Sequence, residues 1–301
     1  MFMGVFMKLF VKIITLFIPI KSLRHAIRRF FDDRYINPLY SPLDMLLKNH
    51  SIYRPAVGYL RDIQLASVKI LKEVDRICNE FNIQYFISFG TLLGAVRHGG
   101  FIPWDDDIDI SMLRDDYKKF VDIFNKNTVF DELQAIFANT GSHIKVCLKG
   151  TSISLDIFCC DVFGKNMSTD EKISFSRKLN SLSKNKMLKN ISKNSYNIEA
   201  EKLTNKLIER ENSNECLKKS TIFYSIEFRH KWTCIVFDYS SIFPLKKIEF
   251  EGTKFYAPKN IDEYLTFIYG NYMEIPNKIK LHSDYRKIGL SEILKIKEFL
   301  R

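Results

Sequence analysis

The sequence has 301 residues, of which 46% are hydrophobic and 27% are charged, which is the composition of an ordinary folded protein and excludes a disordered or fibrous chain. This length is enough for one large domain, or two small ones, with a sizeable buried core. The formal net charge of +11 indicates an anionic partner, namely a phosphate ester, a nucleic acid or an anionic lipid.

Residues 1–30 are predicted to form an amphipathic, basic helix at a membrane surface. Lys8, Lys12 and Thr15 fall on one side of a helix in an otherwise apolar stretch, and basic residues follow directly after it. The apolar run 13–20 is too short to span a bilayer, and the pattern of a cleavable signal peptide is missing. We expect a peripheral segment on the inner face of the plasma membrane, with a true span or packing onto the protein as alternatives.

The cysteines indicate a reducing compartment. They form no CxxC pair and have no spacing with histidine that suits zinc. Scattered cysteines within apolar runs are typical of buried free thiols in a cytoplasmic protein. The six positions are Cys78, Cys147, Cys159, Cys160, Cys216 and Cys234.

Beyond a predicted linker over residues 31–57, apolar residues recur with the period of helices or strands. The first predicted elements are a helix over 58–81, a strand over 84–89, a tight turn at Gly90-Thr91, a short helix over 92–97 ended by His98-Gly99-Gly100, a strand over 108–112 and a helix over 114–125. The later ones are strands over 143–148 and 152–160, a hairpin with strands 248–250 and 254–256 around Glu251-Gly252, and a helix over 261–269 ended by Gly270.

Three segments of different composition follow the linker. Residues 58–165 carry the alternation of strands and helices and are predicted to be a catalytic core. Residues 166–220 are rich in Lys, Asn, Ser and Glu and predict an exposed helical insertion, and residues 221–301 complete the catalytic domain. We expect an α+β fold with an α/β-like core, built on a mixed sheet with helical additions.

An acidic cluster precedes and enters the predicted strand over 108–112. Asp105, Asp106, Asp107 and Asp109 place four carboxylates within five residues, which repel one another unless a cation or a basic partner compensates them. Asp107 and Asp109 are two residues apart, so their side chains project to the same face. Carboxylate oxygens suit Mg²⁺ or Mn²⁺; the alternative interpretation is a solvated turn.

A third acid, Asp156, interrupts the apolar strand predicted over 152–160. A buried carboxylate is costly without a partner. A metal shared with a neighbouring strand would supply one, although a cap or a structural salt bridge would do so too. Two carboxylates from one strand and a third from the next form a recurrent platform for phosphoryl transfer. Gly90 would let backbone amides at the start of a helix approach a phosphate.

The segment 89–109, which reads FGTLLGAVRHGGFIPWDDDID, resembles the signature of the LicD family. That family includes bacterial phosphocholine transferases and is related to the fukutin-type transferases of animals. The similarity continues in weaker motifs at 155–158, at Asp161 and between 243 and 276, so that it covers about residues 60–276.

The resemblance implies a nucleotidyltransferase-like fold that transfers a phospho-alcohol, with phosphocholine as the first candidate. The donor would be a CDP-activated alcohol, and the acceptor a hydroxyl of a lipid-linked surface glycan of the lipopolysaccharide, teichoic acid or capsule type. Asp107, Asp109 and Asp156 match the family's metal-binding and catalytic acids. The amides of Gly90 and Thr91 would then hold a donor phosphate.

Three residues between the glycine turn and the acids have two interpretations each. Arg97 is expected to bind a donor phosphate in a bidentate manner or to form a surface ion pair with the acids. His98 is expected to be a turn residue rather than an acid or base. Trp104 is expected to belong to the core, with stacking on the base or on choline as the alternative.

Other classes of function compete with phospho-alcohol transfer. A nucleotidyltransferase acting on a small molecule would use the same carboxylates and release pyrophosphate instead of CMP. A non-catalytic, membrane-associated glycan-binding protein on a degenerate fold is disfavoured because the three acids are intact. We expect no nucleic-acid partner, because the basic residues are dispersed and match no nucleic-acid motif.

Overall fold

The computed structural model describes residues 55–126, 132–137, 143–164, 167–183, 198, 202–206, 220–224, 235–275 and 289–301. The predicted membrane-surface helix over 1–30 lies outside these residues. So do most of the predicted linker over 31–57, much of the predicted insertion over 166–220, Cys216 and Cys234.

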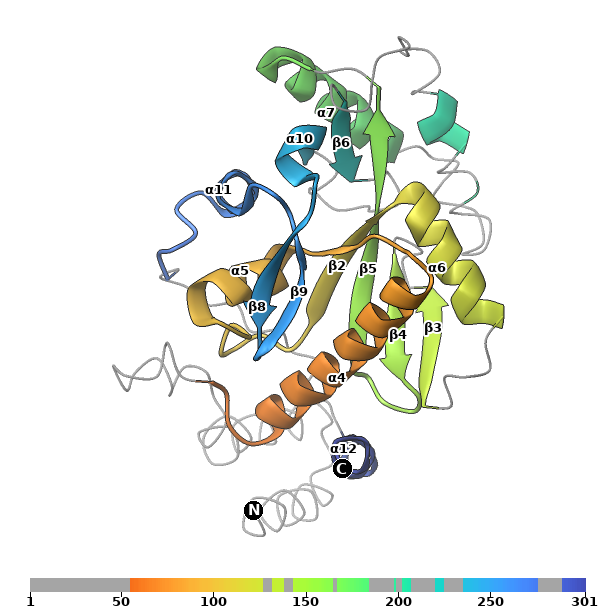
Figure 1. The fold of residues 1–301 in the computed structure, drawn as a ribbon, viewed down its shortest axis with the longest axis vertical. Helices are drawn as coiled ribbons and strands as arrows, with labels where there is room; N and C mark the ends of the chain where they lie inside the picture. Colours follow the sequence, from red (N-terminus) through yellow and green to blue (C-terminus); the bar gives the residue numbers. More distant parts are fainter. Residues whose placement is uncertain are drawn as a thin grey trace, which may run out of the picture.

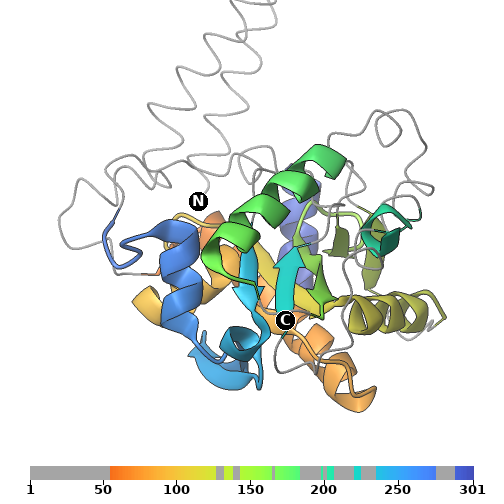
Figure 2. The same ribbon diagram turned by 90° about the horizontal axis from the view of Figure 1, so that it is seen from above.

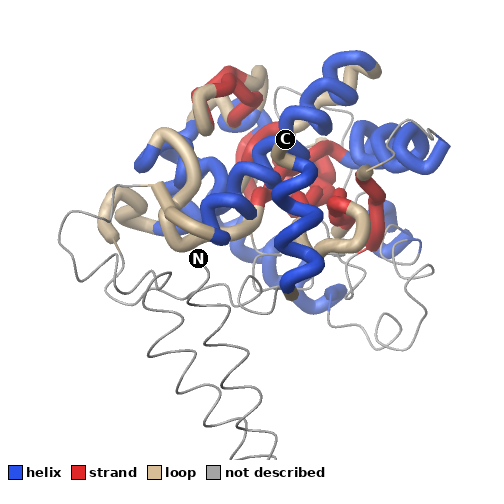
Figure 3. Tube along the Cα trace, turned by 90° about the horizontal axis from the view of Figure 1, so that it is seen from below, coloured by secondary structure: helices blue, strands red, loops and turns tan. Residues whose placement is uncertain are grey.

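A mixed sheet of seven strands lies in the middle of the described structure, with helices around it (Figure 1, Figure 3). The strands are β1 (Phe86–Ile87), β2 (Ile108–Leu113), β3 (Leu133–Phe137), β4 (Ile144–Leu148), β5 (Ser154–Phe163), β6 (Thr221–Tyr224) and β7 (Val236–Asp238). The order is β1-β2-β5-β4-β3, with β6 paired to β5 and β7 to β6. Only β2 and β5 run parallel; the other pairs are antiparallel.

The helices pack around this sheet by their apolar faces. They are α4 (Tyr59–Glu80), α5 (Phe89–His98), α6 (Arg114–Lys126), α7 (Thr169–Ser183), α10 (Tyr239–Ile242), α11 (Ile261–Tyr269) and α12 (Leu290–Phe299). In α4, the buried Ile63, Ile70, Val74 and Ile77 recur every three to seven residues, which forms one apolar stripe. This stripe covers β2, β4 and β5, and α12 contacts α4.

A separate hairpin, β8 (Lys246–Phe250) and β9 (Thr253–Ala257), lies beside the edge of the sheet together with α5 and α11 (Figure 1, Figure 2). β9 contacts β1, and α5 contacts both β8 and α11. The two turn residues, Glu251 and Gly252, have φ angles of +50° and +72°, as the tight turns favoured by hairpins require. The hairpin therefore brings a segment distant in sequence next to α5.

Most elements predicted from the sequence are confirmed, including α4, α6, α11 and the hairpin. The strand predicted over 84–89 is wrong in its extent, because only Phe86 and Ile87 pair as a strand and α5 begins already at Phe89. The separate turn predicted at Gly90-Thr91 is therefore the first turn of α5. Two backbone hydrogen bonds of Ser88 mark the change: its N donates to Asp109 O of β2 at 3.0 Å, and its O accepts from Leu92 N at 3.1 Å, which starts the helix.

The α+β class with a mixed sheet is confirmed. Cys78, Cys147, Cys159 and Cys160 are buried free thiols, as predicted. None of the helices in the described part of the chain combines the length and apolar character needed to cross a membrane.

Candidate active site

Two neighbouring strands bring the predicted acids together. β2 and β5 run parallel, and in their register Asp109 lies directly opposite Asp156. β2 begins at Ile108, so Asp105, Asp106 and Asp107 come immediately before it. The start of β2 therefore gathers acids from two segments that are about fifty residues apart in the sequence.

The acids at this point are close enough to repel one another. Asp105, Asp106 and Asp107 each have one carboxylate oxygen that lies within 4.8 Å of such an oxygen of the other two. Burial raises the pKa of Asp109 well above its ordinary value, and the charges of Asp107, Asp156 and Asp105 raise it further. A divalent cation would offset this repulsion, and hard carboxylate oxygens are the ligands that Mg²⁺ and Mn²⁺ prefer. Among the described residues, the acids whose oxygens come within this distance are Asp105, Asp106 and Asp107. Of the three predicted ligands this group contains Asp107, whereas Asp109 and Asp156 lie opposite each other on β2 and β5, so the predicted metal stays a prediction that the chemistry of these oxygens suits.

Asp156 has two basic partners that the sequence did not single out. Lys145 lies opposite Asp156 on β4, and its Nζ donates to Oδ1 and Oδ2 at 2.7 and 2.9 Å. His143 Nε2 lies 2.9 Å from Oδ2. Burial raises the pKa of Asp156, but the hydrogen bond and charge of His143, together with Lys145, outweigh it and lower the pKa overall. Asp156 is thus held as a carboxylate beside Asp109.

The first turn of α5 is built against the acidic cluster. Phe89 has a φ of +45°, which is an unfavourable conformation for a bulky residue and is common at functional sites. Its ring is held by Phe158 and Tyr224, with centroids at 5.3 and 5.0 Å. A Cβ at Gly90 would lie 2.8 Å from Asp105 Oδ2. Only glycine therefore allows the helix start to approach this carboxylate so closely.

Thr91 ties this helix start to β2, because the Asp109 amide donates to Thr91 Oγ1 at 2.8 Å. Thr91→Val keeps the shape and removes the acceptor, which leaves a buried amide unsatisfied. We expect the free energy of unfolding to fall by about 1–3 kcal/mol, measured by urea denaturation. Thr91→Ser, which keeps the hydroxyl, is the control and should lose clearly less; equal losses in both variants would contradict a role for this hydrogen bond.

Buried hydroxyl groups form a chain behind α5. Ser111 Oγ donates to Ser88 Oγ at 2.9 Å and lies 2.9 Å from Tyr224 OH. Tyr224 OH lies 2.6 Å from Tyr264 OH. Burial raises the pKa of both tyrosines well above the ordinary value, so both hydroxyls stay protonated and able to donate. This chain connects the residue between β1 and α5 to β2, β6 and α11, and it gives Ser88 a structural role.

Comparison with known proteins agrees with this geometry. Residues 82–197 match the family model described as LicD/FKTN/FKRP, nucleotidyltransferase domain. The lipopolysaccharide cholinephosphotransferase LicD of Haemophilus influenzae is 30% identical over 250 residues, which are 72% of this chain and 92% of that protein. The chain belongs to the LicD family. The ribitol 5-phosphate transferase FKRP of Homo sapiens is 47% identical over 34 residues, which are 11% of this chain and 7% of FKRP.

Membership of the LicD family confirms two predictions made from the sequence. The chain is a transferase, and its mixed sheet is that of a nucleotidyltransferase-like domain. The similarity to FKRP covers 34 residues, so it supports a shared motif and does not extend to the whole chain.

Arg97, His98 and Trp104 lie within the LicD motif and make different contacts. Arg97 Nη1 donates to the carbonyls of Tyr272 and Glu274 at 2.9 and 3.2 Å, so this side chain ties α5 to the segment after α11; its predicted contact with a donor phosphate stays a prediction. Trp104 is buried, in agreement with the core interpretation. His98 ends α5 and its ring lies edge-on to Trp104, with centroids 6.1 Å apart.

Tyr269 is the last residue of α11, and the charges of the acids in this LicD site act on it. Burial raises the pKa of Tyr269, and the charges of Asp109, Asp105 and Asp107 raise it further. Its side chain is still partly exposed. α11 also contacts α5, whose first turn lies against Asp105.

Proposed function

We propose that this LicD protein transfers phosphocholine from a CDP-activated donor to a hydroxyl of a cell-surface glycan, in a reaction that depends on Mg²⁺ or Mn²⁺. The observation that carries the proposal is the register of β2 and β5, which sets Asp109 opposite Asp156 beside Asp105, Asp106 and Asp107. It is supported by the Haemophilus influenzae relative, named a lipopolysaccharide cholinephosphotransferase, which this chain matches over most of its length.

In the proposed reaction, the oxygen of the acceptor hydroxyl attacks the phosphorus that carries choline. A new P–O bond forms, the bond from this phosphorus to the oxygen of CMP breaks, and CMP leaves with the electron pair. The hydroxyl proton passes to a carboxylate, for which Asp105, Asp106 and Asp156 are the candidates.

Each part of the site has a role in this proposal. Asp107, Asp109 and Asp156 would hold the metal, which when bound neutralises negative charge on the donor diphosphate and on the leaving group. Gly90 and Thr91 lie at the N-terminal, partially positive end of α5, where backbone amides favour a phosphate. Lys145 and His143 keep Asp156 ionised, which both the metal-binding and the proton-accepting roles require.

The acceptor is proposed to be lipid-linked and reached at the inner face of the plasma membrane. The support is the sequence, in which an apolar stretch with Lys8 and Lys12 on one side is followed by basic residues up to position 29, and the formal net charge is +11. Lipopolysaccharide is the first acceptor to test, because the Haemophilus influenzae relative is named for it; teichoic acid and capsule glycans follow.

The test is release of CMP from CDP-choline by the purified full chain, with Mg²⁺ and a surface-glycan acceptor, and with Asp107→Ala as the inactive control. We expect release that needs both metal and acceptor and is lost in the variant. Release only from CDP-glycerol or CDP-ribitol would keep the reaction and change the alcohol. Release of pyrophosphate from a nucleoside triphosphate, with none of CMP from any CDP donor, would replace the proposal by nucleotidyl transfer.

A further inference from the structure

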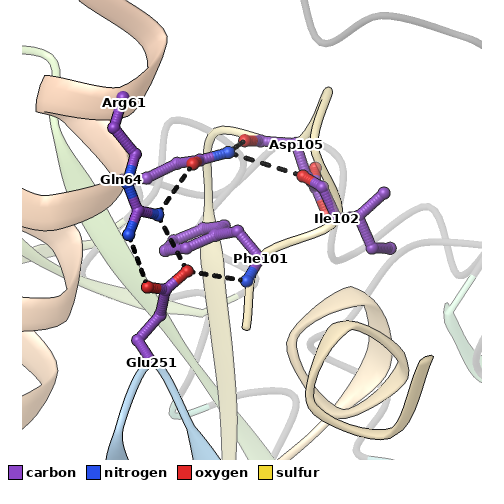
Figure 4. Close-up of polar contacts among 6 residues, drawn as sticks. All are labelled: Arg61, Gln64, Phe101, Ile102, Asp105 and Glu251. Atoms are coloured by element: carbon purple, nitrogen blue, oxygen red, sulfur yellow. Dashed lines mark hydrogen bonds and ion pairs between the residues drawn. The ribbon is translucent and has the colours of Figure 1, made fainter. Parts of the chain in front are cut away.

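Three side chains from distant segments hold the loop that leads to the acidic cluster (Figure 4). Arg61 and Gln64 lie one turn apart on α4, and Glu251 lies in the turn of the β8–β9 hairpin. Arg61 Nη1 and Nη2 donate to Glu251 Oε1 and Oε2 at 2.9 and 2.7 Å. We call Arg61, Gln64 and Glu251 the clamp, and residues 99–105 the clamped loop.

Glu251 contacts the start of the clamped loop with both its side chain and its backbone. Its Oε1 accepts from Phe101 N at 3.0 Å, and its own amide donates to Gly99 O at 3.1 Å. A Cβ at Gly100 would lie 2.5 Å from Oε1, so the glycine is what lets the carboxylate lie against the backbone. The loop and the carboxylate are therefore fitted to each other.

Gln64 contacts the end of the clamped loop. It is fully buried, and its Nε2 donates to Asp105 O at 2.8 Å and to Ile102 O at 3.4 Å. Its Oε1 accepts from Arg61 Nη1 at 3.3 Å. The amide therefore has partners for both its nitrogen and its oxygen, and it connects the Arg61–Glu251 ion pair to the backbone of the first acid.

The clamped loop sets where Asp105 lies relative to α5. The carboxylate of Asp105 lies so close to Gly90 that a Cβ there would be 2.8 Å from its Oδ2, and Asp106, Asp107 and Asp109 follow directly along the chain. A displacement of the loop would therefore change the position of the acids relative to the first turn of α5. At catalytic sites, a displacement of about 1 Å is enough to reduce activity.

The backbone of Glu251 is an independent sign that this residue is specially placed. Its φ of +50° is unfavourable for a residue with a side chain, and Asn, Asp or Gly is usual at this position of a hairpin turn. The ion pair with Arg61 and the hydrogen bond from Phe101 compensate for this conformation. Strained residues held by their surroundings are typical of sites under functional constraint.

We propose that Arg61, Gln64 and Glu251 are positioning residues for the transfer reaction: they act through the clamped loop to fix the acids relative to α5. The inference rests on the proposed function. It goes beyond that function because it assigns roles to α4 and to the hairpin, which contribute none of the predicted metal ligands.

The experiment compares Glu251→Ala, Glu251→Gln and a matched control on the same helix, Arg76→Gln, in the full chain. Arg76 forms exposed ion pairs with Glu73 and Glu80 at 2.7 and 2.6 Å. Four readouts are measured: kcat and KM for CMP release, Mn²⁺ affinity by electron paramagnetic resonance of the free ion, hydrogen exchange over residues 99–105, and the melting temperature.

We expect Glu251→Ala to lower kcat and Mn²⁺ affinity by about 10–100-fold, as loss of partners behind metal ligands does, with a smaller change in KM. Exchange over the clamped loop should become faster. Glu251→Gln keeps an acceptor for Phe101 N and loses the charge that pairs with Arg61, so it should be intermediate. Arg76→Gln should match the wild type in all four readouts.

Faster exchange over the clamped loop without a change in kcat or Mn²⁺ affinity would overturn the proposal, as would equal losses in Arg76→Gln. If Glu251→Ala is unfolded at the assay temperature, the decision passes to Glu251→Gln and Arg61→Lys, with the same readouts. A wild-type protein without transfer activity would refute the proposed function instead. Hydrogen exchange over residues 99–105 and Mn²⁺ affinity would then test whether the clamp positions the acids.

Discussion

Asp109→Asn is expected to reduce phosphocholine transfer about 10³-fold, as loss of several kcal/mol of metal-dependent stabilisation implies, and yet to stabilise the metal-free protein. Asp109 is the acid that the surroundings keep from ionising, since burial and the charges of Asp107, Asp156 and Asp105 all raise its pKa. Asparagine keeps the shape and removes the charge. The melting temperature without metal should therefore rise by roughly 2 °C.

The difference in stability between Asp109→Asn and the wild type, both without metal, depends on pH with a definite sign. An acid whose pKa is raised on folding destabilises the folded state above that raised pKa, where the group must ionise against its surroundings. Below the pKa of the unfolded state the group is protonated in both states and the effect vanishes. The stability advantage of Asp109→Asn should therefore be largest above the raised pKa of Asp109, should shrink as the pH falls below that pKa, and should be gone below the pKa of the unfolded state.

Added Mg²⁺ separates this explanation from a general change in stability. The metal should raise the melting temperature of the wild type, because a ligand that binds only the folded state stabilises it, and should do little for Asp109→Asn. The control is Asp122→Asn, an exposed acid on α6, which should respond to Mg²⁺ like the wild type. Equal stabilisation of Asp109→Asn and the wild type by Mg²⁺ would remove Asp109 from the metal site.

The parts of the site that could be predicted from the sequence are those encoded locally. The segment 89–109 contains Gly90, the start of a helix and the acidic cluster within 21 residues, and the acid Asp156 within a largely apolar strand indicated a partner. The places of α4, α6 and α11 followed from periodicity, and the place of the hairpin from the Glu251-Gly252 turn, because these signals are also local.

The parts that could not be predicted depend on the pairing of distant segments. Lys145 reaches Asp156 only because β4 pairs with β5, and Glu251 reaches Arg61 across 190 positions of sequence. The left-handed backbone of Phe89 was also missed, because a bulky residue with positive φ is stabilised by tertiary aromatic contacts. No local pattern carries this information.

Arg114→Met is expected to cause the largest loss of stability, about 3–5 kcal/mol, because it leaves a buried carboxylate without its partner. Arg114, the first residue of α6, forms a bidentate ion pair with Asp161 of β5: Nε lies 2.8 Å from Oδ1 and Nη2 lies 2.6 Å from Oδ2. The side chains are only 15% and 5% exposed, so water cannot replace the lost partner. Urea denaturation measures the loss.

The double variant Arg114→Met, Asp161→Leu separates the cost of an unpaired charge from the value of the pair. Removing both charges from a buried pair is often close to neutral, so the double variant should recover most of the stability that Arg114→Met loses. Arg76→Met, which breaks an exposed pair on α4, should lose at most about 1 kcal/mol. A double variant as unstable as the single one would mean that Arg114 acts by packing α6 onto β5 and not by neutralising Asp161.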